Sequence, residues 1–139
     1  NRDAHPNHRA VRAAAGPEVR FLGAIYEPAV VQALRLHSRL YVHGHRVGGT
    51  NPSLVEALGA GNAVVAHDNG FNRWVAGEAA RCFGSADEAA RCFDELLADP
   101  AALQRLQAAA RARHAAAFQW ADILAAYEAM LLQWQQAPR

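Results

Sequence analysis

Short apolar runs alternate with amphipathic stretches along the first two thirds of the chain. The apolar runs are 19-VRFLG-23, 39-RLYVH-43, 62-NAVVA-66 and 80-ARCF-83. Each is nearly all apolar rather than alternating, which is typical of strands buried on both faces of a parallel sheet. Helical patterns between them are predicted over 28–37, 52–60 and 71–76. This order of strand, helix and strand indicates βαβ units and therefore an α/β fold.

From residue 85 onward only helical patterns remain. A capping box that begins at Ser85 precedes a helix over 86–98, and Asp99 caps a second helix over 100–117. A last helix carries one apolar stripe at helical spacing, formed by Trp120, Ile123, Leu124, Tyr127, Met130, Leu131 and Trp134. We expect this stripe to be packed in a core. Its aromatic content favours packing across a neighbouring surface, and a part of the protein missing from this chain is one candidate for that surface.

Composition and charge exclude several classes of protein. All fourteen basic residues are arginine, and thirteen acids balance them, so the chain lacks the charge of a nucleic-acid-binding protein. No apolar run approaches the roughly 18 residues of a membrane span, and no secretory signal is present. Cys82 and Cys92 are ten residues apart, and reduced thiols are favoured over a disulfide. A cytoplasmic protein is therefore expected.

The first eighteen residues read differently from the rest. They are polar and are broken by Pro6 and by Gly16-Pro17. We therefore interpret 1–18 as a lead-in from a missing upstream part, and 19–139 as a domain of a longer protein.

The segment 48-GGTNPSLVEALGAGNAVVAHDNG-70 carries the clearest chemistry. In open α/β sheets, ligands bind beyond the carboxyl ends of the strands, where loops meet helix N-termini. Gly48 and Gly49 let the backbone approach a ligand, and a helix that begins at Pro52 has unpaired N–H groups in its first turn. Side-chain donors are added by Thr50, Asn51 and Ser53. The segment predicts a phosphate or diphosphate site, and the alternative is an ordinary glycine loop with a helix cap.

Glu56 makes the ligand-binding interpretation stronger. It lies among Leu54, Val55 and Leu58 in a short helix. A carboxylate in such surroundings has to face solvent or be paired with hydroxyls or a cation, because burying it alone is costly. Accepting hydrogen bonds from a ribose diol is one such use.

Two histidines end the second apolar run. His43 and His45 project to the same side if the strand continues, which leaves three alternatives: a metal site, the lining of a donor pocket, or packing at the strand end. His67 and Asp68 form either a turn or a substrate contact. Arg73 is either a phosphate ligand or a surface arginine. A helical pattern places Arg105, Arg111 and Arg113 on a solvated face.

These motifs resemble a known family. The block 41-YVHGHRVGGTNPSLVEALGAGNAVVAHD-68 resembles the nucleotide-sugar-binding half of the retaining, GT-B-fold glycosyltransferases of group 1 or family 4. The segment 19–43 looks like the strand, loop, helix and strand that precede their site, and 118-FQWADILAAYEAML-131 is similar to their closing helix. The strings HGHRVGGTNPSL at 43–54 and FNR at 71–73 resemble bacterial rhamnosyltransferases of capsule and O-antigen assembly more closely.

The resemblance implies a fold and an activity. The fold would be a Rossmann-like parallel sheet, a partial C-terminal half of a GT-B fold, with a helical C-terminal tail. The intact enzyme would transfer a sugar such as rhamnose from a nucleoside diphosphate sugar, for example dTDP-rhamnose, to a lipid-linked or polysaccharide acceptor, with retention. It would use no metal or other cofactor and would work at the inner face of the cell membrane. The implied partner is a missing N-terminal domain, without which this fragment is expected to be inactive.

The resemblance also implies roles for single residues. Glu56 matches the glutamate that would hold the donor ribose, and the loop residues Gly49, Thr50 and Asn51 would meet the sugar and diphosphate. Ile25 falls where the family packs the base. The other substrate-binding candidates are Gly48, Pro52, Ser53, His43 and His45. A second family glutamate would fall at position 48, which is glycine here, so the catalytic residues stay unassigned. Two alternatives remain: a nucleotide-sugar epimerase of similar build, and a non-catalytic nucleotide-sugar-binding module.

Overall fold

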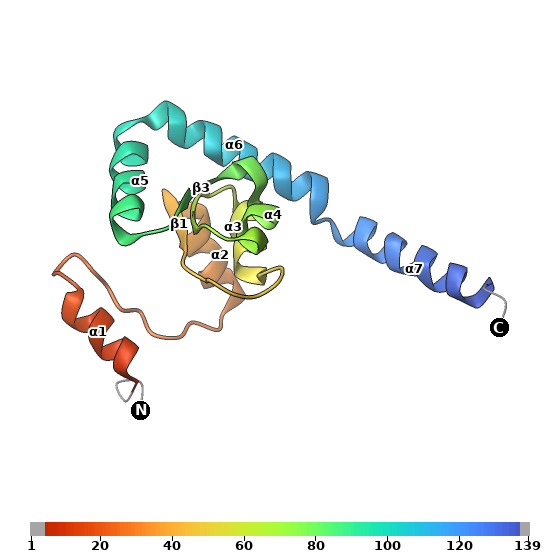
Figure 1. Ribbon diagram of the computed structural model, residues 1–139, viewed down its shortest axis with the longest axis horizontal. Helices are drawn as coiled ribbons and strands as arrows, with labels where there is room; N and C mark the ends of the chain where they lie inside the picture. Colours follow the sequence, from red (N-terminus) through yellow and green to blue (C-terminus); the bar gives the residue numbers. More distant parts are fainter. Residues whose placement is uncertain (1–4, 137–139) are drawn as a thin grey trace. The chain divides into compact units, whose positions relative to one another are not determined.

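The computed structural model describes residues 5–136, and the chain divides into two units, Asn1–Val31 and Gln32–Arg139. In the first unit, residues expected to be a polar lead-in form helix α1 (Pro6–Ala14) (Figure 1). Pro6 does not break the chain but starts this helix, and the His5 ring accepts a hydrogen bond from the Asn7 N–H at 3.2 Å. Proline is tolerated at that position because its missing N–H would be unpaired there in any residue.

The second unit contains a three-stranded parallel sheet in the order β1-β2-β3 (Figure 1). Its strands are β1 (Leu40–His43), β2 (Ala63–His67) and β3 (Ala80–Phe83). The register pairs Leu40 with Ala63 and Val64 with Ala80. The predicted α/β fold with a parallel sheet and a helical C-terminal part is confirmed, and these three runs begin and end within one residue of the prediction.

The helices also follow the sequence pattern closely. Their bounds are α2 (Pro28–His37), α3 (Pro52–Ala60), α4 (Gly70–Ala76), the 3-10 helix η1 (Gly77–Ala79), α5 (Ala86–Ala98), α6 (Pro100–Ala117) and α7 (Trp120–Gln136). Side-chain caps explain several starts: Asn51 for α3, Ser85 for α5 and Asp99 for α6. Both cysteines are free, Cys82 exposed and Cys92 buried, as expected.

The strand predicted over 19–23 is wrong. The described residues there form no strand, and Val19, Phe21 and Leu22 are 45%, 47% and 60% exposed. A β-strand is defined by hydrogen bonds to a neighbour, and no described strand pairs with this run. Its apolar composition favours a strand, but no neighbouring strand is available to pair with it in the described part of the chain.

β2 is buried on both faces and lies between two apolar clusters. Val64 and Ala66 belong to the cluster on one face, which contains Leu54 and Leu58 of α3. Ala63 and Val65 belong to the other, together with Cys92, Leu96 and Leu103. α6 contributes to both, with Leu103 on the second face and Ala110 on the first. Successive residues of a strand point to opposite faces, which explains why this run is uninterrupted by polar residues.

The amphipathic α7 contradicts the expected burial of its stripe. Among its described side chains, Trp120, Tyr127 and Trp134 are 75%, 60% and 83% exposed. The helix was predicted correctly, but within residues 5–136 nothing covers this face, so core packing is wrong for it. No described helix is long and apolar enough to span a membrane.

One arginine expected on a solvated face is instead structural. Arg113 of α6 donates to the carbonyl groups of Trp74 and Val75 at 2.6 and 3.0 Å, and its guanidinium lies 5.4 Å from the Phe118 ring centroid. It thereby satisfies carbonyl groups at the end of α4, which otherwise lack partners within the helix. Helical spacing alone does not reveal this contact, because the partner lies on another element.

Candidate functional site

The loop over residues 44–51 leaves the carboxyl end of β1 and enters α3. Its backbone is open to approach, since a Cβ atom built on Gly48 or Gly49 would meet no atom within 4 Å. Gly48 has φ of 129°, a conformation that residues with a side chain rarely adopt. The predicted position of the loop, between a strand's carboxyl end and a helix N-terminus, is thus the observed one.

The donors at the start of α3 differ from the expected set. Asn51 caps the helix, and its Oδ1 accepts a hydrogen bond from the Ser53 N–H at 3.0 Å. The Asn51 carbonyl accepts from Leu54 and Val55, so the first-turn N–H groups are already paired. Pro52 has no N–H to offer. Among the described residues, no acceptor is found for the N–H groups of Gly48, Gly49, Thr50 and Asn51, which lie just before the helix.

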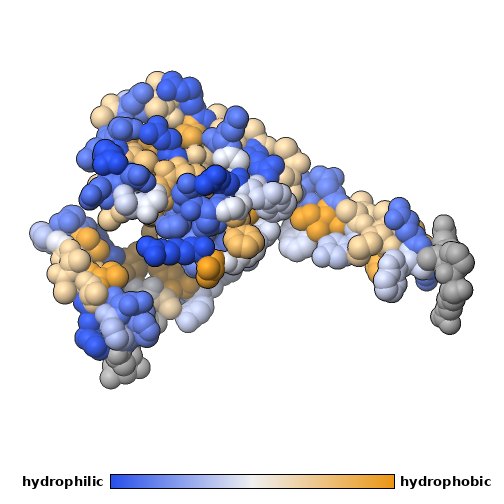
Figure 2. Space-filling view, viewed as in Figure 1, coloured by the Kyte–Doolittle hydropathy of each residue, from blue (hydrophilic) through white to orange (hydrophobic). Residues whose placement is uncertain are grey.

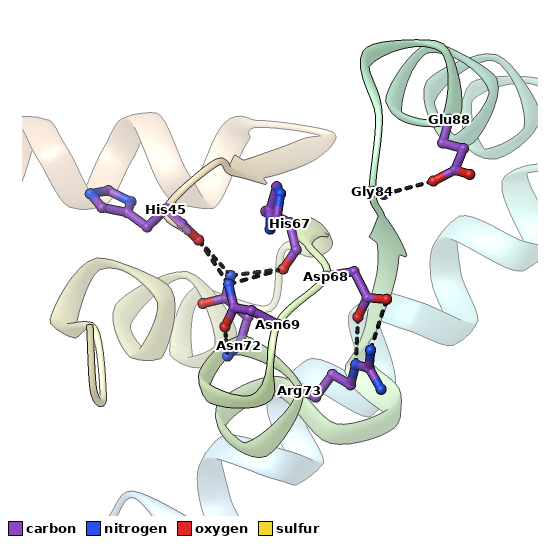
Figure 3. Close-up of polar contacts among 8 residues, drawn as sticks. All are labelled: His45, His67, Asp68, Asn69, Asn72, Arg73, Gly84 and Glu88. Carbon is purple, nitrogen blue, oxygen red and sulfur yellow. Dashed lines mark hydrogen bonds and ion pairs between the residues drawn. The ribbon is translucent and has the colours of Figure 1, made fainter. Parts of the chain in front are cut away.

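Asn72 holds this loop to the sheet (Figure 3). Its amide nitrogen donates to the His45 carbonyl at 3.0 Å and to the His67 carbonyl at 2.9 Å, and its side chain is buried, with the residue only 4% exposed. Asn69 donates to the same His45 carbonyl at 3.0 Å and caps α4 by accepting from the Asn72 N–H. The strings at 43–54 and 71–73 are therefore joined by hydrogen bonds. Sequence reasoning noted both strings but gave Asn72 no role.

The acid and arginine beside this clamp are paired with one another. Arg73 and Asp68 make a two-pronged ion pair, with Nη2 at 2.9 Å from Oδ2 and Nε against Oδ1 (Figure 3). Hydrogen bonding to Asp68 and its charge raise the pKa of Arg73. The Asp68 N–H donates to the Phe83 carbonyl at 2.8 Å. Both residues thus have structural partners, which favours the turn and surface interpretations over a phosphate contact.

His43 and His45 lie against one another at the end of β1. Their ring centroids are 4.7 Å apart and the ring planes differ by 25°. In stacked rings the nitrogen lone pairs lie in nearly parallel planes and do not converge on one ion, which argues against a metal site. No group of three or more histidine, cysteine, aspartate or glutamate side chains able to hold a metal ion occurs in the described part of the chain.

His43 is almost fully buried, at 1% exposure, whereas His45 is exposed. Burial, and secondly the neighbouring His45, lower the pKa of His43, so its imidazole is neutral at pH 7. Its Nδ1 lies 3.5 Å from the Tyr41 hydroxyl. Its Nε2 has no partner among the described residues, and His45 stacks over the same ring. Packing at the strand end therefore accounts for the contacts of the His43 ring, except that Nε2 is left without a hydrogen-bond partner among the described residues.

Glu56 is paired with a cation and half-exposed, which is one of the states expected for it. Its Oε2 lies 2.6 Å from Nη2 of Arg35 on α2, and the two side chains are 47% and 13% exposed. Tyr41 lies close by. Burial raises the pKa of its hydroxyl, while Arg35 and a hydrogen bond with Ser53 lower it. A cluster of polar side chains thus lies between β1, α2 and α3, beside the loop.

The remaining candidate is Ile25. Ile25 belongs to the first unit, so its role in packing a base stays a prediction. The structure brings together the loop residues, His43, His45 and Glu56 around the carboxyl half of β1 and the start of α3.

A family model described as glycosyl transferase-like matches residues 4–129. No significant match is found among curated proteins or among solved structures. The matched range includes all three strands, the loop over 44–51 and the Asn72 clamp. Because the match covers most of the chain, this protein belongs to the glycosyl transferase-like family.

Proposed function

We propose that this chain is the donor-binding part of a glycosyltransferase that uses a nucleoside diphosphate sugar. The observation that carries the proposal is the run of four unpaired backbone N–H groups over 48–51, on an open loop at the carboxyl end of a parallel strand. Successive backbone N–H groups bind an anion where they converge on one point, and this is the arrangement proposed for the loop. Family membership supports the transfer of a sugar in general.

The loop would act on the leaving group. As the glycosidic bond to the donor breaks, negative charge develops on the diphosphate, and N–H groups held in place before the reaction stabilise that charge. Asn72 and Asn69 hold the loop by the His45 carbonyl, which reduces the reorganisation that binding would otherwise require. Gly48 and Gly49 leave room for phosphate oxygens to approach the backbone.

Glu56 would hold the donor ribose. Arg35 is paired with its Oε2, and about half of the Glu56 side chain is exposed, so the carboxylate is open to a further hydrogen bond. A ribose hydroxyl can therefore bond to Oε1 while Arg35 fixes the orientation of the carboxylate. A hydrogen bond to a charged group contributes about 1.5–3 kcal/mol.

The finer assignments rest on the resemblance described above. They are a donor such as dTDP-rhamnose, a lipid-linked or polysaccharide acceptor, retention of configuration, and a second domain that completes the active site at the inner face of the cell membrane. His43 and His45 would border the sugar pocket. Catalytic groups would come from outside the described cluster, because position 48 supplies no carboxylate.

Charge on the loop tests the proposal. Gly49→Asp and Gly49→Asn differ by one charge at nearly the same shape, and the open surroundings of Gly49 accept either side chain. Binding of UDP, dTDP and GDP is measured by calorimetry. The comparison uses whichever of these nucleotides binds most tightly. We expect Gly49→Asp to bind it at least about tenfold more weakly than Gly49→Asn, because the aspartate would repel the negatively charged diphosphate.

The matching nucleoside without phosphates serves as the control ligand. Its binding should not distinguish the two variants. Equal diphosphate affinity for Gly49→Asp and Gly49→Asn would exclude the loop as the diphosphate site.

A non-catalytic nucleotide-sugar-binding module is the second candidate. The observation that favours it is the combination of glycine at position 48 with a Glu56 already paired to Arg35. Tight donor binding by the longer protein without any sugar transfer would distinguish this function from the first.

A further inference from the structure

Asn62 is a buried amide at the opposite end of α3 from the loop. Figure 2 shows hydrophilic residues over much of the visible surface of the second unit, whereas Asn62 is only 1% exposed. Its side-chain nitrogen donates to the Arg35 carbonyl at 2.6 Å, and to the Ser38 carbonyl and hydroxyl at 3.3 and 2.9 Å. Its Oδ1 is buried without a partner among the described residues. An unpaired buried acceptor lowers stability, so packing alone does not explain an asparagine at this position.

The bonds of Asn62 close the carboxyl end of α2. The Arg35 carbonyl belongs to the last turn of this helix, where carbonyl groups have no partner within the helix. The helix ends at His37 and is followed by serine, not by the glycine that often closes a helix. The N–H and hydroxyl of Ser38 also donate to the Arg35 carbonyl, at 3.2 and 2.9 Å. Removing the Asn62 amide would therefore loosen the turn that contains Arg35.

The same asparagine is bonded to the helix that carries Glu56. Its backbone N–H donates to the carbonyl of Ala57, the residue that follows Glu56, at 3.0 Å. The Arg35 guanidinium pairs with the Glu56 carboxylate at 2.6 Å. α2 and α3 are thus joined twice, once through Asn62 and once through the ion pair. Arg35 is therefore held at its carbonyl by Asn62 and at its guanidinium by Glu56.

We propose that Asn62 is a positioning residue for the ribose contact of Glu56 and that it acts through Arg35. This inference rests on the proposed function, in which Glu56 holds the donor ribose. The Arg35 side chain is only 13% exposed, so its guanidinium has little room to adjust independently of its backbone. A carboxylate that is held in place before binding loses less conformational freedom when it accepts a ribose hydroxyl. Loosening α2 therefore weakens ribose binding without any direct contact between Asn62 and the ligand.

The discrimination between a nucleotide with and without ribose hydroxyls measures this role. Calorimetry of the full chain compares UDP, dTDP and GDP with the dideoxy analogue of each, which lacks the ribose hydroxyls. The ratio is the Kd of the analogue divided by the Kd of its parent, for the parent that binds most tightly. We expect a wild-type ratio of at least about tenfold. Asn62→Ala should lower this ratio at least about threefold, because Glu56 is no longer held for the hydroxyl.

Asn72→Ala is the matched control, because Asn72 is also a buried amide that donates to two carbonyl groups. Its loss releases the loop and should weaken the binding of parent and analogue alike, so their ratio should not change. A smaller folded fraction also affects both ligands equally and cancels in the ratio. In a Glu56→Ala background, Asn62→Ala should have no further effect on the ratio, since the residue through which it acts is absent.

The outcomes separate this inference from the proposed function. If the wild-type chain discriminates and Asn62→Ala keeps the wild-type ratio, the positioning role is wrong and the ribose role of Glu56 stands. A wild-type ratio near one would remove the ribose role of Glu56 and this inference with it. If Asn62→Ala does not fold, Ser38→Ala takes its place, because it removes the hydroxyl that bonds to both Asn62 and the Arg35 carbonyl. It should also lower the ratio, and an unchanged ratio there would overturn the inference.

Discussion

At the scale of single residues, His43 shows how the fold constrains a polar side chain. It ends β1 at 1% exposure, beneath the His45 ring. Burial, followed by the charge that His45 can carry, lowers its pKa from the ordinary value of 6.5. Protonating it in the folded state is therefore unfavourable, and stability should depend on pH.

The sign of this dependence follows from proton linkage. As the pH falls through 6.5, the unfolded chain takes up a proton at His43 that the folded chain does not, so the free energy of unfolding decreases. The decrease ends once the pH is below the folded-state pKa. We predict that His43→Gln reduces the difference in free energy of unfolding between pH 7.5 and pH 5, measured with urea.

His37→Gln is the control for this prediction, because His37 is exposed on α2. It should keep the wild-type pH dependence. If His43→Gln also keeps the wild-type dependence, the shift assigned to this residue is wrong.

Several residues of the candidate site could be identified from their type and position alone. Gly48 and Gly49 lie where the sequence predicted, between a strand and a helix. Asn51 was predicted as a side-chain donor to the ligand, whereas its Oδ1 caps α3 by accepting from the Ser53 N–H. The partner of Glu56 could not be predicted. Arg35 lies 21 residues earlier on another helix, and only tertiary packing brings the two together.

At the scale of elements, Asn72 joins three of them. It lies on α4, and its side-chain amide donates to carbonyl groups at the ends of β1 and β2. A buried amide with two accepting partners contributes more than an exposed one, because its removal leaves carbonyl groups without a donor in a dry environment. The loop over 44–51 therefore depends on a residue more than twenty positions downstream.

We predict that Asn72→Ala lowers the free energy of unfolding by about 1–3 kcal/mol. Asn72→Asp should lower it further at neutral pH, because a carboxylate would face two carbonyl oxygens. The extra loss should diminish as the pH falls and the carboxyl group becomes a donor. Urea denaturation at two pH values measures both effects.

Asn69→Ala provides the comparison, since Asn69 makes a similar bond to His45 but is less buried. Its effect should be nearer 1 kcal/mol, the usual cost of a lost helix cap. If the Asn72 variants are as stable as Asn69→Ala, the hydrogen bonds of Asn72 add no stability beyond that of a helix cap.

The element pattern was predictable wherever local signals and packing agree. Proline at the first turn and side-chain caps fixed the bounds of α3, α5 and α6. The run over 19–23 failed because a strand needs a partner that no local signal reveals. The α7 stripe failed for a related reason: periodicity predicts which face is apolar, but not what covers it.

At the scale of the whole molecule, stability is concentrated in the middle of the chain. Every residue that is buried among those described lies between His43 and Ala110. The first unit, Asn1–Val31, contributes none of them.

We therefore predict that deleting residues 1–26 changes the free energy of unfolding by less than about 0.5 kcal/mol, the usual range for surface changes. The deletion keeps α2 and also Glu27, whose carbonyl accepts from the Val30 and Val31 N–H groups at the start of this helix. Urea denaturation followed by circular dichroism measures the change. A loss of more than about 1 kcal/mol would show that the first unit supports the sheet.

α6 gives this central region its unity. Leu103 packs in the apolar cluster on one face of the sheet, and Ala110 packs in the cluster on the other face. One helix therefore takes part in both clusters. Neither apolar cluster can unfold while the other stays folded, so we expect the region to unfold as one cooperative unit. A destabilising substitution far from the loop then lowers the fraction of folded molecules that can bind a ligand. A mutation in the core under the sheet would therefore weaken function without changing any residue that contacts the ligand.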